Sequence, residues 1–129
     1  MQKQDVVRYV RTYIGKTKAR AVATLEGGDV TVDFNLEPWS RSNSAARRGF
    51  NDRSRKLFDR LFSDFSNAER IEITAYGEFV DVRGHAKRYK TAYAALSRRT
   101  AAGINFRYVK KENLPSIVDS CWMHPALLK

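Results

Sequence analysis

Two stretches of the chain alternate apolar and polar residues, which is the pattern of a β-strand with one buried face. In residues 29–36, valine, phenylalanine and leucine occupy the even positions and polar residues the odd ones. Residues 19–26 precede this run and Gly27-Gly28 supplies a turn, so the sequence predicts a β-hairpin. A second hairpin is predicted where residues 70–75 and 79–83 flank Tyr76-Gly77-Glu78.

Two further stretches repeat their apolar residues at helical spacing. Residues 45–65 place large apolar side chains on one face of a helix, at Phe50, Leu57, Phe58, Leu61, Phe62 and Phe65. Residues 85–100 place a narrower stripe at Tyr89, Ala92, Tyr93 and Leu96. The segment Ala101-Ala102-Gly103 is typical of a helix end. An amphipathic helix is therefore predicted after each hairpin.

The order of these elements predicts an α+β fold with the arrangement ββα-ββα. The two hairpins would form one antiparallel sheet, and both helices would pack on one of its faces. Short extra elements are predicted near the two ends, namely a helix within residues 6–14 and a helix beginning at Pro115. A chain of 129 residues can bury a core of its own, so residues 1–129 are predicted to form a single domain.

The distribution of positive charge predicts a class of partner for this fold. The chain has a net charge of +10, and the excess is concentrated in two regions. Residues 41–68 carry seven Lys or Arg against three Asp, and residues 85–129 carry nine Lys or Arg against two acids. Because a field of this sign attracts phosphate-rich polymers, nucleic acid is the predicted partner.

The candidate phosphate contacts lie on the two predicted helices and in the segments before the first helix. On the first helix, Arg53, Lys56 and Arg60 form a stripe away from the phenylalanines. Asp52 and Asp59 flank this stripe and would weaken its field. The full predicted set of basic contacts is Lys16, Lys18, Arg20, Arg41, Arg47, Arg48, Arg53, Lys56, Arg60, Lys87, Arg88, Lys90, Arg98 and Arg99.

Aromatic residues add a second kind of candidate contact. Trp39 lies beside Arg41 in the loop before the first helix, where it would either stack on an unpaired base or cap the edge of the core. Tyr76 is expected to be exposed at a hairpin turn. Tyr89 and Tyr93 share a helical stripe and are expected in the core.

Motifs for catalysis or metal binding are incomplete. Gly15-Lys16-Thr17 matches the last positions of a phosphate-binding loop, but Val10 stands where that loop requires its first glycine. Cys121 and His124 have zinc-ligand spacing, but His85 is the only other histidine. The acids of the predicted strands lack the arrangement of a metal-dependent nuclease: Asp33, Glu72 and Asp81. We therefore predict no catalytic residue, no metal and no cofactor, and do not expect an enzyme.

These observations favour a nucleic-acid-binding module that contacts mainly the phosphate backbone through basic helices. Single-stranded DNA or RNA is slightly favoured over duplex, because no helix-turn-helix spacing is evident. The alternative is an adaptor or inhibitor that docks its basic face on an acidic protein. The apolar segment 122–128 motivates this alternative, because such residues must pack or meet a partner. The sequence is compatible with self-association and does not decide it.

A cytoplasmic location is expected. The single cysteine, Cys121, cannot form an intramolecular disulfide, and residues 1–5 lack the apolar region of a secretory signal. Charged residues interrupt every apolar run well short of membrane-spanning length, so no membrane association is expected.

Overall fold

The computed structural model describes residues 22–35, 43–80 and 83–125. The helix predicted within residues 6–14 lies outside these ranges. The described elements follow in the order β1 (Val22–Glu26), β2 (Asp29–Asn35), α2 (Asn43–Asp64), β3 (Arg70–Val80), β4 (Ala86–Ser97), α3 (Arg98–Ala101), the 3-10 helix η1 (Lys111–Asn113), α4 (Leu114–Ile117) and β5 (Ser120–Met123).

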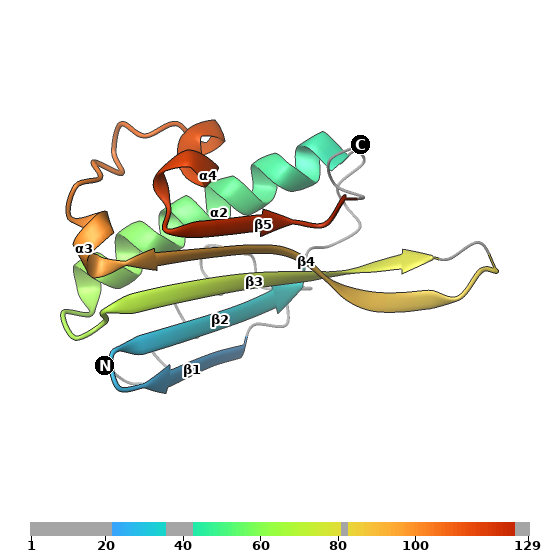
Figure 1. Ribbon diagram of the computed structural model, residues 1–129, viewed down its shortest axis with the longest axis horizontal. Helices are drawn as coiled ribbons and strands as arrows, with labels where there is room; N and C mark the ends of the chain where they lie inside the picture. Colours follow the sequence, from blue (N-terminus) through green and yellow to red (C-terminus); the bar gives the residue numbers. More distant parts are fainter. Residues whose placement is uncertain (1–21, 36–42, 81–82, 126–129) are drawn as a thin grey trace.

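The strands form one mixed sheet in the order β1-β2-β3-β4-β5 (Figure 1). The first hairpin is found where the sequence predicts it, with Gly27 at a φ of 61°, a conformation that glycine adopts without strain. The strand β2 pairs with β3 in parallel, and the other neighbours are antiparallel. The parallel pair follows from α2, because a chain that crosses back along a helix returns in the same direction.

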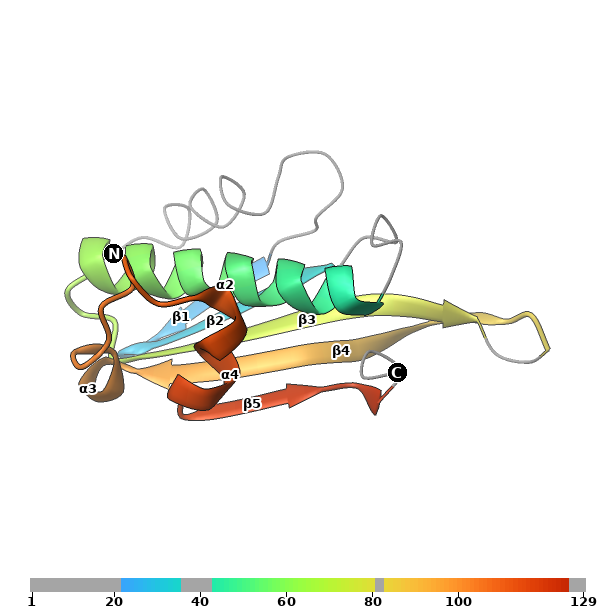
Figure 2. The same cartoon turned by 90° about the horizontal axis from the view of Figure 1, so that it is seen from above.

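The helix α2 covers one face of this sheet, and the core lies between them (Figure 2). It spans 22 residues, close to the predicted range, and buries its phenylalanine and leucine stripe. Opposite lie apolar side chains from three neighbouring strands: Val30, Val32, Phe34, Ile71, Ile73, Ala75, Ala92, Ala94 and Leu96. Because α3, η1 and α4 also contact α2 or pack beside it, all helices of the described residues lie on this side.

The predicted ββα-ββα arrangement with an antiparallel sheet is wrong. Residues 86–97, predicted as helix, form the strand β4, which pairs with β3 at eleven register positions. The segment contains alternation as well as a helical stripe, since Ala92, Ala94 and Leu96 all face α2. Alanine is a strong helix former and a weak strand former, so local sequence favoured the helix and the pairing with β3 overrode it.

The second hairpin also turns later than predicted. The strand β3 continues through Tyr76-Gly77-Glu78 to Val80, and β4 begins at Ala86, two residues after Gly84, which has a φ of 82°. As a result β3 and β4 extend past the end of β2 as a two-stranded arm (Figure 1). We define the arm as the five register pairs from Tyr76 and Lys90 to Val80 and Ala86, with residues 83–85.

Arg98 joins the end of β4 to the C-terminus of α2. Its Nε donates to the carbonyl of Ala68 at 2.7 Å, and its Nη2 donates to the carbonyls of Phe65 at 2.8 Å and Phe62 at 3.2 Å. The last carbonyls of a helix have no partner within the helix and carry partial negative charge. The predicted phosphate contact Arg98 therefore serves as the C-terminal cap of α2.

Replacing Arg98 with alanine is expected to lower the free energy of unfolding by about 2 kcal/mol, because hydrogen bonds from a charged group are lost and carbonyls are left unsatisfied. The neighbouring exposed Arg99 supplies the matched control, and Arg99→Ala should change stability by less than about 0.5 kcal/mol. Urea unfolding measures both. Equal midpoints for the two variants would show that the cap contributes nothing.

Asp119 ties the start of α3 to the segment before β5. Its Oδ1 accepts a hydrogen bond from the Thr100 hydroxyl at 2.6 Å, and its Oδ2 accepts from the backbone N–H of Ser97. The hydrogen bond from Thr100, followed by those from Ser97, holds the pKa of Asp119 below its ordinary value of 3.8. The charged carboxylate therefore stabilises the fold above that value, and this stabilisation is lost as the pH falls through the lower folded pKa.

The Asp119→Asn variant should consequently lose less stability on acidification than the wild type. The comparison is the change in urea midpoint between about pH 6 and pH 3, the range in which an unfolded carboxyl group begins to bind a proton. Parallel pH profiles for the two proteins would contradict the assignment of this carboxylate to the folded-state hydrogen bonds.

Candidate nucleic-acid interface

Part of the predicted contact set falls outside the described residues. These positions are Lys16, Lys18, Arg20, Trp39 and Arg41. The remaining basic residues lie on α2, on β4 and on α3.

The basic stripe on α2 is present but partly engaged. Lys56 forms an ion pair with Asp52, with 3.2 Å between Nζ and Oδ2. Burial alone would raise the pKa of Asp52, but hydrogen bonds and charges from Lys56 and Arg55 hold it below its ordinary value. Arg53 is half-buried, which lowers the pKa of its guanidinium. Arg60 and Arg48 are exposed, and Arg48 donates to the Ser44 hydroxyl at 2.9 Å.

The second predicted basic cluster does not form a helical ridge. Lys87, Arg88 and Lys90 lie on β4, whereas Arg98 and Arg99 lie on α3 at the other end of that strand (Figure 1). Arg88 and Lys90 belong to the face of the sheet opposite α2. The two predicted basic clusters therefore do not make one surface.

The face of the sheet opposite α2 is the new candidate surface. Within the described part of the chain no helix packs on it (Figure 2), and we call it the uncovered face. The strand registers place on this face the following residues: Thr31, Asp33, Asn35, Arg70, Glu72, Thr74, Tyr76, Arg88, Lys90, Tyr93, Ala95, Ser120 and Trp122. Aromatic rings and cations thus share one flat surface of β3, β4 and β5.

Two residues fix the position of Arg88 at the base of the arm. Its Nε and Nη2 donate to the Asn35 Oδ1 at 3.2 and 2.8 Å, and its guanidinium lies 4.1 Å from the centre of the Tyr76 ring. Burial raises the pKa of Asp33 on the same face, while the charge of Arg88 opposes that shift. Arg88 is exposed, but Asn35 and Tyr76 hold its guanidinium in a fixed position.

Lys90 lies between two aromatic rings. Its ammonium is 4.5 Å from the centre of the Tyr93 ring and 5.5 Å from that of Trp122, within cation–π range of both. Trp122 remains 42% exposed, and His124 meets its ring edge-on with 6.1 Å between centroids. This arrangement combines a large accessible π-face with a positive charge. Tyr93, expected in the core, lies instead on the uncovered face.

One acid of the uncovered face, Glu72, is also engaged by neighbouring side chains. Glu72 accepts hydrogen bonds at its Oε1 from the Tyr93 hydroxyl at 3.1 Å and from Arg70 at 3.1 and 3.3 Å. The positive charge of Arg70 partly neutralises this carboxylate, so it weakens the attraction of the surface for phosphate less than a lone acid would.

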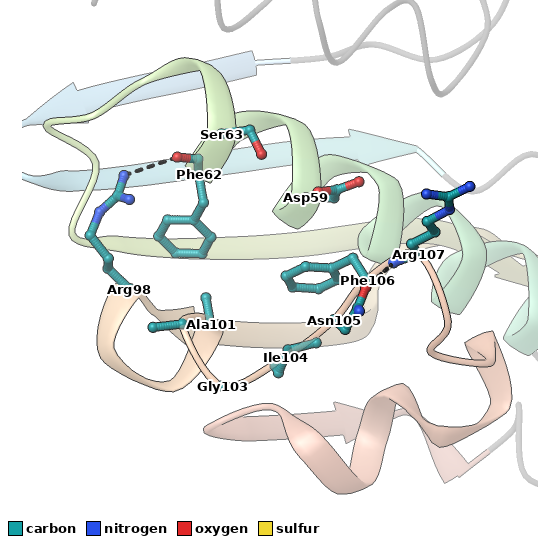
Figure 3. Close-up of a pocket in the computed structure, with 11 residues that line it drawn as sticks. Asp59, Phe62, Ser63, Arg98, Ala101, Gly103, Ile104, Asn105, Phe106 and Arg107 are labelled. Atoms are coloured by element: carbon teal, nitrogen blue, oxygen red, sulfur yellow. Dashed lines mark hydrogen bonds between the residues drawn. The ribbon is translucent and has the colours of Figure 1, made fainter.

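A pocket of about 600 Å³ lies elsewhere, between the C-terminal half of α2 and residues 98–107 (Figure 3). Arg98 lies at one end of it and Arg107 at the other. The Arg98 guanidinium donates to the carbonyls of Phe62, Phe65 and Ala68, at and just after the end of α2. The Arg107 guanidinium is exposed and lies 5.6 Å from the centre of the Tyr108 ring. Arg98 therefore already serves the fold.

No group of three His, Cys, Asp or Glu residues in the described part of the chain could hold a metal ion. No helix among the described residues is long and apolar enough to span a bilayer.

Comparison of the chain with protein-family models, curated proteins and solved structures found no match. The function is therefore argued from the residues of this chain alone.

Sequence reasoning missed Trp122 and misplaced Tyr93. Both became visible only once residues 86–97 were paired as a strand, because Tyr93 and Trp122 are register partners on β4 and β5. Part of the signal was present in the sequence, since residues 92–96 alternate as a strand does, but the bulge at Thr91 that brings Lys90 to the face of Tyr93 carries no such signal.

Proposed function

We propose that this protein binds nucleic acid and holds an unpaired stretch of it on the uncovered face of β3, β4 and β5. The observation that carries the proposal is the placement of Lys90 between the rings of Tyr93 and Trp122. Proteins that bind single strands combine aromatic rings, on which bases stack, with cations that contact the backbone. The uncovered face has both within one short stretch of sheet.

An unpaired strand fits this face better than a duplex does. Bases within a duplex are stacked on one another and cannot place a ring against Trp122, whereas unpaired bases can. A second stacking position lies beside it, where Arg88 covers Tyr76 and offers a flat guanidinium to a base or phosphate. We expect little preference for base sequence, since every base has a π-face.

Charge supports the same class of ligand. The net charge of +10 would attract any polyanion, and counterion release would make the affinity depend steeply on salt. The basic residues of α2 lie behind the sheet, where they add to the long-range field without contacting a strand on the uncovered face. We therefore propose that the basic residues of α2 attract the nucleic acid over a distance and that the uncovered face contacts it.

Trp122→Ala should weaken binding of a single-stranded oligonucleotide by about fivefold or more, because one stacked base contributes about 1–3 kcal/mol. The matched control is Tyr108→Ala, which removes a 74% exposed ring from the loop beside α2. Fluorescence anisotropy with labelled single-stranded DNA and RNA measures both. Equal affinities of the two variants would exclude stacking on Trp122.

Lys90→Ala should weaken the same binding and lower the slope of log affinity against log salt by about one unit, the loss of one phosphate contact. Trp122→Ala should leave this slope unchanged, since stacking releases no counterion. If the folded wild-type protein binds neither DNA nor RNA at low salt, the proposal fails. The positive surface must then bind an acidic protein.

A further inference from the structure

The arm carries positive charge on both of its sides. Alternation along β4 places Arg88 and Lys90 on the side continuous with the uncovered face, and Lys87 and Tyr89 on the other. Arg83 and His85 come directly before β4 and are exposed. In β4 and the described part of the turn, residues 83–90 include four Lys or Arg and no acid. The one acid in the β3 limb, Glu78, is the register partner of Arg88.

The arm projects away from the core. The described residues from Arg83 to Lys90 whose side chains are placed are all exposed, on both sides of the ribbon. A two-stranded ribbon without a core to pack on is only marginally stable in water. Such a ribbon suits a ligand that can contact both of its sides at once, and a single strand lying on the sheet contacts only one.

The major groove of B-form DNA has the matching dimensions. It is about 12 Å wide and about 8.5 Å deep, and it admits a two-stranded β-ribbon between two walls of phosphates. The five pairs of the arm extend about 15 Å along the strands. Cations on both sides of the ribbon would then face one phosphate wall each. The major groove of A-form RNA is too narrow and deep for such an element.

We propose that the arm enters the major groove of a DNA duplex that continues into the single strand held on the uncovered face. This inference rests on the proposed function and adds the class of substrate: DNA with a junction between duplex and single strand. Lys90 links the two parts, because it lies at the base of the arm and also between the rings of Tyr93 and Trp122. The chain thus has adjoining surfaces for the two halves of such a junction.

The test uses anisotropy with labelled probes of equal total length: single-stranded DNA, blunt duplex DNA, duplex DNA with a single-stranded overhang of each polarity, and the same junctions made of RNA. The variant Arg83→Ala/Lys87→Ala removes two charges from the arm. The control Arg99→Ala/Lys110→Ala removes two charges from exposed positions on α3 and the loop before η1. Urea midpoints verify that both variants remain folded.

We expect one polarity of junction DNA to bind about tenfold more tightly than single-stranded DNA, with a salt slope greater by about two units. The arm variant should lose this advantage and keep its affinity for single-stranded DNA within about twofold. The control variant should retain the advantage, and junction RNA should lack it.

Equal binding of junction and single-stranded DNA, or equal loss in the arm and control variants, would overturn the role of the arm while single-strand binding stands. Absence of binding to every probe would overturn the proposed function and this inference together. If blunt duplex DNA binds most tightly, the proposed preference for a junction is wrong, since the uncovered face would then contribute nothing to binding.

Discussion

The antiparallel pairing of β3 with β4 decides the location of every other part of the structure. It joins the apolar positions of β4 to those of β3 and β2, so that α2 finds one continuous surface to cover. Side chains alternate along a strand, and a bulge opposite the Ala75–Tyr76 step adds Thr91 to β4. Tyr93 and Lys90 therefore both lie on the opposite face. Trp122 joins them through the pairing of β5 with β4. A shift by one residue would exchange the two faces, bury Lys90 and expose Leu96, and the hydrophobic cost fixes the register.

Covering only one face leaves the sheet with two different surfaces. The face toward α2 is apolar and is covered by the helix. No helix of the described residues covers the other face, so its side chains must tolerate contact with water. That second surface combines rings, cations and paired acids instead of a uniform polar layer, and Arg88 and Glu72 are each fixed by hydrogen bonds. Side chains that are already ordered lose less conformational entropy when a ligand binds, which favours binding at this surface. The basic residues of α2 lie on the other side of the molecule, and in the proposed function they add to the long-range field without contacting the ligand.

Much of the fold could be predicted where one periodicity dominates. The alternation of residues 29–36 and the phenylalanine stripe of α2 each allow one structure, and both elements form as predicted. Residues 86–97 are compatible with both a helix and a strand, because their alanines favour a helix. Only the pairing with the partner strand decides between the two structures. This error moved Tyr93 into the core. The parallel pairing of β2 with β3 was missed separately, although the helix that requires it was predicted. Charge predicts a class of ligand, and that stays a prediction. The position of each cation depends on pairing between residues distant in sequence, as with Arg98 and the carbonyls of Phe62, Phe65 and Ala68.

The most direct test of the central claim is to map the surface that single-stranded DNA contacts, by following backbone amide resonances of the isotopically labelled protein during titration with an oligonucleotide. We expect the largest shifts in β3 near Tyr76, in β4 from Arg88 to Tyr93, and in β5 at Trp122, with small shifts along α2. Shifts concentrated on α2 around Arg53, Lys56 and Arg60, with the sheet unchanged, would contradict the assignment of binding to the uncovered face.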